Sequence, residues 1–186
     1  MTQASRSIGA LAMAAGLLAS GCSGERPTAA APTPVAIPDD WTVTESSSHD
    51  VRIALPPWLV AFDNTSGVFA NEVAPAGTQS MQLFVEGPRA DSQPAFGQDL
   101  RAWLSERLRD VGSGNPMFED VQLPSGPAVV MDRTDRAGTR LAWRHRAWAI
   151  RVRTGVAFLW IDGPPDTWAD READLARIPL LLALRP

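Results

Sequence analysis

The sequence contains no lysine and no tyrosine, and it has one cysteine and two histidines. A single cysteine excludes a disulfide within the chain. All 17 basic residues are therefore arginine, and the 21 acidic residues leave a net charge of −4 at pH 7. Because the arginines are interleaved with Asp and Glu, with no basic domain, we predict no nucleic-acid partner. A GC-rich genome would explain the arginine bias, so we draw no functional conclusion from it.

Recognisable catalytic and metal-binding patterns are also missing. No cluster has the ligand spacing of a zinc or calcium site, and no Gly-x-Ser-x-Gly nucleophile motif is present. The glycine-rich stretch 111–116 follows a predicted helix, whereas a phosphate-binding loop precedes one. His49 lies in a polar turn, and His145 lies between Arg144 and Arg146, two cations that disfavour a metal. We therefore predict no catalytic residue, no metal site and no cofactor.

Residues 1–21 have the features of a secretory signal peptide. Arg6 supplies a positive charge, and the apolar run at 8–20 is shorter than the roughly 20 residues that span a bilayer. The run ends in Leu-Ala-Ser-Gly-Cys, which resembles the bacterial lipobox. That resemblance implies cleavage between Gly21 and Cys22 and attachment of lipid to the cysteine sulfur. The alternative is a free cysteine in an ordinary signal peptide.

The lipobox resemblance has one departure, and a linker follows it. Most lipoboxes have leucine three residues before the cysteine, where this chain has Ala19. Residues 22–40 contain four prolines and almost no large apolar side chains. Such a segment cannot bury enough surface to offset its ordering entropy, so we interpret it as a lipidated, Pro/Ala-rich spacer. The folded domain is then expected at 41–186.

The domain sequence predicts an α+β fold. Period-two alternation and turn residues predict strands at 41–44, 50–55, 68–74, 80–86, 118–121 and 128–132, and 58–62 reads as a loop or short strand. Helical spacing of apolar residues predicts a helix over 92–111, with Ser92 as its N-cap. Asp166 or Thr167 is expected to cap a last helix that runs to about Ile178 and ends or kinks at Pro179, because proline lacks an N–H. Residues 180–184 are expected to be buried in another way, such as a final turn on the sheet.

The clearest pattern in the domain is a β-hairpin over 139–161. A turn at 154–155 is predicted from Thr-Gly, and it places Arg151 opposite Phe158. Alternation then puts Trp148, Ile150 and Val152 on one face with Ala157, Leu159 and Ile161, and puts Arg151 and Arg153 on the other with Val156, Phe158 and Trp160.

This hairpin also supplies the one stretch with binding character. Arginine and tryptophan are favoured anchors of protein interfaces. The candidate binding patch consists of Arg140, Arg144, Arg146, Arg151 and Arg153, together with Trp143 and Trp148. The alternative is that the tryptophans belong to the core and the arginines form a solvated face.

The order of the elements resembles the PsbP-type fold. The resemblance is carried by 51–58 (VRIALPPW), the helix after Asp91-Ser92, and 123–130 (LPSGPAVV), and it covers most of 40–186. The group includes photosystem PsbP proteins, DcrB, a nuclear-transport factor that binds the Ran GTPase, and LpqN-type lipoproteins of actinobacteria. It implies an antiparallel sheet flanked by helices in an α/β/α sandwich, and it implies no catalytic residue. Pro179 and the lack of tyrosine in the second hairpin strand depart from the pattern.

Three functions remain open from the sequence. The leading hypothesis is a non-catalytic accessory or binding protein, held by lipid on the extracytoplasmic side of the cell membrane, with an envelope protein as partner. The second is a carrier of a small molecule or lipid, with an apolar pocket between sheet and helix. The third is a hydrolase built on His49 or His145.

Overall fold

The computed structural model describes residues 35–48, 50–64, 67–76, 78–88, 99–135 and 142–185. The chain divides into two compact units, Met1–Ala31 and Pro32–Pro186, and all described residues belong to the second. The signal peptide, Cys22, most of the linker, His49 and Arg140 lie outside the described residues. The expectations that concern them therefore stay predictions.

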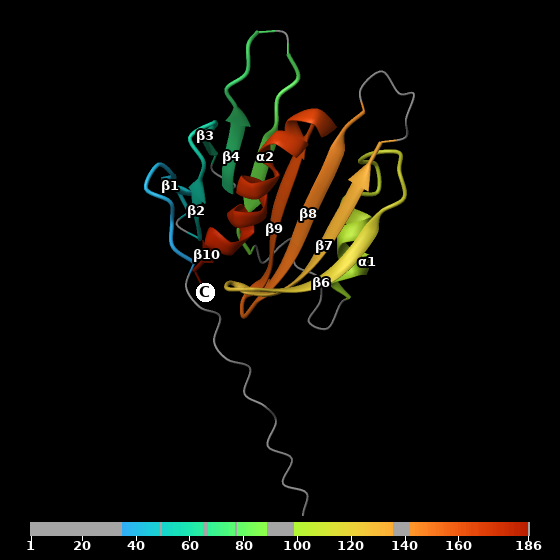
Figure 1. Ribbon diagram of the computed structural model, residues 1–186. Coiled ribbons are helices and arrows are strands. Elements are labelled where there is room, and N and C mark those ends of the chain that lie inside the picture. Colours follow the sequence, from blue (N-terminus) through green and yellow to red (C-terminus); the bar gives the residue numbers. More distant parts are fainter. Residues whose placement is uncertain are drawn as a thin grey trace, which may run out of the picture. The chain divides into compact units, whose positions relative to one another are not determined.

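The described strands form two antiparallel sheets (Figure 1). One has three strands in the order β1-β2-β10, and the other has seven in the order β3-β4-β5-β9-β8-β7-β6. Their bounds are β1 Thr42–Glu45, β2 Val51–Leu55, β3 Leu59–Asn64, β4 Gly67–Glu72, β5 Gln82–Glu86, β6 Met117–Leu123, β7 Gly126–Thr134, β8 Arg144–Val152, β9 Gly155–Gly163 and β10 Leu182–Leu184. Every predicted strand is confirmed, and 58–62 is largely strand.

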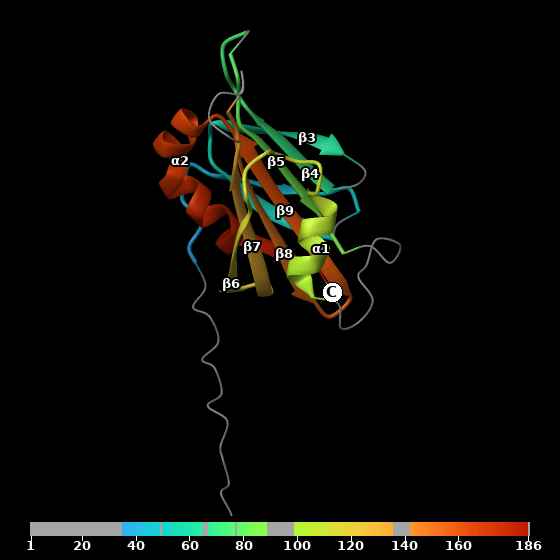
Figure 2. The same ribbon diagram turned by 90° about the vertical axis from the view of Figure 1, so that its right-hand side faces the viewer.

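Two helices cover opposite faces of the seven-stranded sheet, as Figure 2 shows with the sheet seen nearly edge-on. Helix α1 (Leu100–Arg107) packs Leu104 against Ala149 and Phe158, which point to one face. Helix α2 (Pro165–Arg177) packs Trp168 against the other face. Because successive strand residues point to opposite faces, β8 and β9 contribute to both cores.

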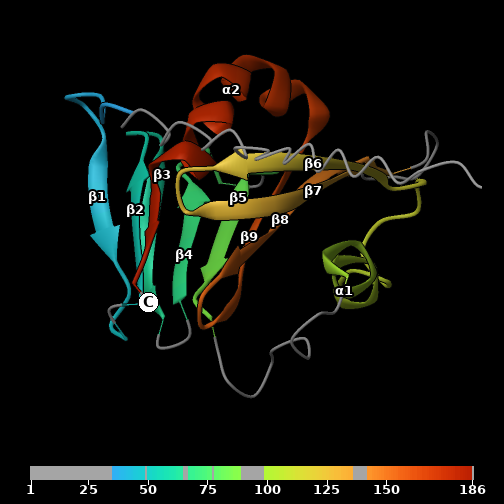
Figure 3. The same ribbon diagram turned by 90° about the horizontal axis from the view of Figure 1, so that it is seen from below.

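The layers correct the predicted sandwich in part. An antiparallel sheet flanked by helices is confirmed. The face that carries α2, however, is shared with the three-stranded sheet, whose Ile53 and Leu55 join the same core as Leu83 (Figure 3). The layer on this face therefore consists of a helix and a small sheet, and not of helices alone. Among the described residues, neither helix has the length and apolar character needed to cross a bilayer.

The first helix is shorter than the sequence predicts. It starts at Leu100, because the Asp99 carboxylate accepts a hydrogen bond from the Arg101 N–H at 2.9 Å and so caps the helix. It ends at Arg107, and Gly112 then takes a positive φ of 73°. The predicted end at 111 is thus wrong. The predicted N-cap Ser92 lies outside the described residues.

The C-terminal segment agrees with its prediction only in part. Helix α2 begins at Pro165 after Pro164, and no side chain caps it, so the predicted N-cap at Asp166 or Thr167 is wrong. The α-helix ends at Arg177, so the predicted end just before Pro179 is confirmed, and Pro179 lies in the 3-10 turn η1 (Ile178–Leu181) that follows. Strand β10 follows and pairs with β2, which is how the last apolar residues become buried.

The hairpin of β8 and β9 is confirmed, but its register is displaced. The two-residue turn is 153–154 rather than 154–155, and Arg151 pairs with Val156 instead of Phe158. The displacement of the pairing is two residues, so each side chain keeps its predicted face.

Candidate functional site

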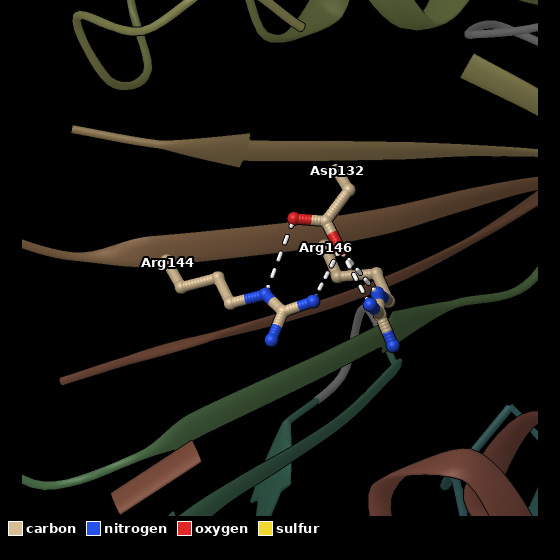
Figure 4. Close-up of polar contacts among 3 residues, drawn as sticks. All are labelled: Asp132, Arg144 and Arg146. Carbon is tan, nitrogen blue, oxygen red and sulfur yellow. Dashed lines mark hydrogen bonds and ion pairs between the residues drawn. The ribbon is translucent and has the colours of Figure 1, made fainter. Parts of the chain in front are cut away.

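One carboxylate lies between two guanidinium groups on the α2 face of the sheet (Figure 4). Asp132 comes from β7, and Arg144 and Arg146 come from the neighbouring strand β8, where Arg146 is the direct partner of Asp132. Arg144 donates from Nε at 3.2 Å and from Nη2 at 2.9 Å. Arg146 donates from Nε at 2.9 Å and also from Nη2. The antiparallel register thus builds the cluster without any loop.

The cluster lies against the core rather than in open solvent. The Asp132 side chain is only 15% exposed, and those of Arg144 and Arg146 are 28% and 21% exposed. Both guanidinium groups stack over the Trp168 ring of α2, at 5.0 and 5.6 Å from its centroid. Burial alone would raise the pKa of the Asp132 carboxyl, but the hydrogen bonds and charges of the two arginines outweigh it and lower that pKa.

The structure does not gather the predicted arginine patch on one surface. Arg144 and Arg146 are even-numbered residues of β8 and point to the α2 face with Trp148. Arg151 is odd-numbered and belongs to the opposite face, and Arg153 lies in the hairpin turn. Among the described arginines of the patch, Arg144 and Arg146 therefore lie together, and Trp148 lies on the same face.

Asp132 is the central residue that the sequence analysis missed. It was predicted as the end of a strand, but no partner was assigned to it. The signal was available, because 128–132 and the hairpin are adjacent strands joined by a polar turn. Pairing them antiparallel places an acidic residue beside the arginines at 144 and 146.

A groove of about 790 Å³ runs from this cluster between the sheet and the second half of α2. This is within the roughly 300–1,000 Å³ typical of ligand sites. Its lining comes from β6, β7 and β8 on one side and from α2 and η1 on the other. Strand β6 forms this edge of the sheet (Figure 3). The lining is largely apolar and includes Val121, Leu123, Val130, Trp148, Pro179 and Leu180.

A second hollow of about 490 Å³ lies between β1 and β3. Val60 and Phe62 line it and are 44% and 50% exposed. Ligand sites combine apolar walls with a few convergent charged or polar groups. The polar lining of the second hollow consists of Thr42, Thr44 and Glu45 on edge strand β1. In the groove, the side chains of Asp132, Arg144 and Arg146 converge and are at most 28% exposed, so the groove is our candidate site.

His145 is placed differently from the sequence interpretation. The flanking arginines point to the other face, and the imidazole lies between two carboxylates. Its Nε2 is 3.8 Å from Asp135 Oδ1, and its Nδ1 is 3.8 Å from Asp162 Oδ2. The side chain is 8% exposed and stacks on Trp160. Within the described residues, no group of three or more His, Cys, Asp or Glu side chains is arranged to hold a metal ion.

Burial governs the protonation of this cluster. It raises the pKa of Asp162 from 3.8 to about 6. It also lowers the pKa of His145, against the charge of Asp135, with Arg133 adding to the lowering. Both groups therefore favour their neutral forms in the folded chain.

We expect Asp162→Asn to stabilise the protein at neutral pH. The folded chain holds a proton on Asp162 that the unfolded chain releases between about pH 4 and pH 6, so this contribution to stability is lost as pH rises through that window. A shift of roughly two pKa units corresponds to about 3 kcal/mol. The variant should raise the free energy of unfolding by up to that amount at pH 7.5, and leave it unchanged at pH 3.5, in urea unfolding.

The pH dependence of the variant's stability and a control variant, Asp110→Asn, extend this test. Because the pKa of His145 is lowered, its contribution is present above pH 6.5 and is lost as pH falls, so the variant's stability should decline below pH 6.5. Asp110→Asn changes an exposed carboxyl and should stay within about 0.5 kcal/mol of the parent chain. Equal curves for Asp162→Asn and the parent chain at pH 7.5 would contradict the burial argument.

The arrangement of sheets and helices is that of the PsbP-type fold, as comparison with solved structures shows. The cyanobacterial PsbP protein of Synechocystis aligns with a TM-score of 0.55 and 8% identity, over 78% of this chain and 93% of its own. A Pseudomonas aeruginosa protein of unknown function aligns at 0.52 and 17% identity, over 78% and 98%. The yeast Ran-binding protein Mog1p aligns at 0.50 and 7% identity, over 77% and 95%. No family model and no curated protein matches the sequence.

Proposed function

We propose that this protein is a non-catalytic binding protein of the cell envelope, held on the extracytoplasmic side of the membrane by lipid on Cys22. The signal peptide and lipobox patterns of the sequence support the location and the anchor. The Pro/Ala-rich linker then gives the domain reach above the membrane surface.

The groove beside Asp132 is the observation that carries the binding role. Paired arginines at one end and apolar walls along the rest provide both orientation and contact area. A binding role needs no catalytic residue. The hydrolase alternative has weaker support, because His145 is buried between two carboxylates with only 8% of its side chain exposed.

The hypotheses drawn from the sequence give two kinds of ligand for the groove. The first is an envelope protein that uses the Arg/Trp part of the groove, and the second is a small molecule or lipid. The apolar lining favours the second kind, because Val121, Val130 and Leu180 remain only partly buried by the chain itself.

Site-specific photo-cross-linking in cells tests the proposed function. A photoreactive amino acid replaces Val121 in the groove, and a matched control replaces Ser105 on α1, which is exposed on the opposite face. We expect a discrete adduct from position 121 and none from 105. Identical adduct patterns from both positions, or an adduct from 105 alone, would show that the groove is not the binding site.

A further inference from the structure

The groove has a charged end and an apolar end, separated along α2. Arg144 and Arg146 mark the charged end, above Trp168 near the start of the helix. Pro179 and Leu180 mark the apolar end. At 1.5 Å per residue, the nine steps from Trp168 to the end of α2 at Arg177 correspond to roughly 14 Å, and η1 extends beyond them. The site is therefore elongated, with three of its four charged side chains at one end, while the fourth, Glu119 of β6, pairs with Val130.

The charged end has capacity for a further anion. Two guanidinium cations share one carboxylate, so one net positive charge remains there. The bonds to Asp132 use Nε and Nη2 of each arginine, and within the described part of the chain Nη1 of each has no acceptor. Glu119 is the remaining charged residue of the lining, and it is exposed on edge strand β6, where water and salt screen it.

The apolar end fits a hydrocarbon chain. Val121 and Leu123 of β6 and Val130 of β7 lie on the same face of the sheet, opposite Pro179 and Leu180 of η1. Covering such partly exposed side chains removes apolar surface from water. A long, narrow apolar surface is best covered by a flexible linear chain.

We propose that the groove binds a single-chain amphiphile with an anionic headgroup, which is a carboxylate or a phosphate. The headgroup contacts Arg144 and Arg146, and the apolar chain runs along β6 and β7 toward η1. Guanidinium groups match both anions in geometry and charge. This inference rests on the proposed function, because it names the ligand of the same groove. An inorganic anion would use the charged end alone, and a protein segment would pair with edge strand β6.

The test uses the full-length chain in phosphatidylcholine nanodiscs and a long-chain fatty acid with a diazirine near the end of its chain. After irradiation, cross-linked peptides are mapped by mass spectrometry. We expect adducts in β6 and η1. Unlabelled fatty acid and lysophosphatidate should suppress these adducts, whereas the fatty alcohol of equal length and inorganic phosphate should not.

Three variants separate a headgroup site from a structural ion pair. Arg144→Gln with Arg146→Gln should weaken the fatty acid at least about tenfold, because charge-assisted hydrogen bonds are lost. Asp132→Asn should strengthen it by up to about tenfold, because the competing carboxylate is removed. Arg101→Gln with Arg109→Gln removes the same charge from α1 and the turn that follows it, and should change nothing. If the double arginine variant fails to fold, the affinity of Asp132→Asn for the fatty acid still tests the headgroup site.

Each remaining outcome overturns the inference in a distinct way. Fatty alcohol competing as well as fatty acid, or an unchanged affinity in Asp132→Asn, would remove the headgroup site. Competition by inorganic phosphate alone would leave an anion site without an acyl chain. No fatty-acid adduct in the groove, with a protein adduct from position 121 in cells, would refute the amphiphile and keep the proposed function. No adduct in either experiment would refute both.

Discussion

Trp168→Ala should lower the free energy of unfolding by about 3–5 kcal/mol, the cost typical of removing a buried tryptophan. The side chain is 0% exposed and fills the core between α2 and the sheet. Its ring also lies under the guanidinium groups of Arg144 and Arg146. The substitution therefore leaves a cavity and removes the support of the charged end of the groove.

Two control variants separate these contributions. Trp168→Phe keeps an aromatic ring and should cost less, because the indole Nε1 has no hydrogen-bond partner among the described residues. Trp103→Ala removes a half-buried ring from α1 on the opposite face and should cost less than Trp168→Ala, because less apolar surface is lost from the core. Urea unfolding followed by circular dichroism measures all three. A loss below about 1 kcal/mol for Trp168→Ala would contradict the described core.

Cys22→Ala should abolish attachment of the protein to the membrane. Each buried methylene of an acyl chain contributes about 0.8 kcal/mol, so several chains on one cysteine give stable anchoring. The cysteine is the only one in the chain, so no second thiol can replace it. Metabolic labelling with an alkyne fatty acid, followed by membrane fractionation, reports both the lipid and the location.

Ser23→Ala is the matched control for this prediction, because it changes the neighbouring residue and leaves the thiol. It should stay labelled and membrane-bound. A Cys22→Ala variant that remains in the membrane pellet and still carries the label would refute lipidation at this position. The chain would then be secreted or held by another means.

The faces of the strands followed from the sequence, whereas the ends of elements did not. Alternation in β8 and β9 placed Trp148 and Phe158 on their correct faces, because side-chain parity survives a two-residue displacement. The turn was predicted one residue too late. Gly155 was expected to lie in the turn, but it is the first residue of β9, with a φ of 151°. Strand β10 was missed because it forms only by pairing with β2, and the sequence around residues 182–184 gives no sign of that pairing.

The sequence predicted the arginines of the candidate site but neither its carboxylate nor its groove. Arg144 and Arg146 were named, but Arg151 was grouped with them although its parity puts it on the other face. Asp132 was missed because the pairing of β7 with β8 joins residues 12 and 14 positions apart. The groove depends on how α2 and η1 lie over the sheet, and this tertiary arrangement has no signature in the sequence.

The resonance of the Trp148 indole N–H tests the central claim most directly. Trp148 lines the groove, and Trp103 lies on the opposite face as an internal reference. In full-length chain with ¹⁵N-labelled tryptophan in nanodiscs, we predict that added fatty acid shifts the Trp148 signal in a saturable way and leaves Trp103 unchanged. An unchanged Trp148 signal, or equal shifts of both residues, would contradict the assignment of the groove as the binding site.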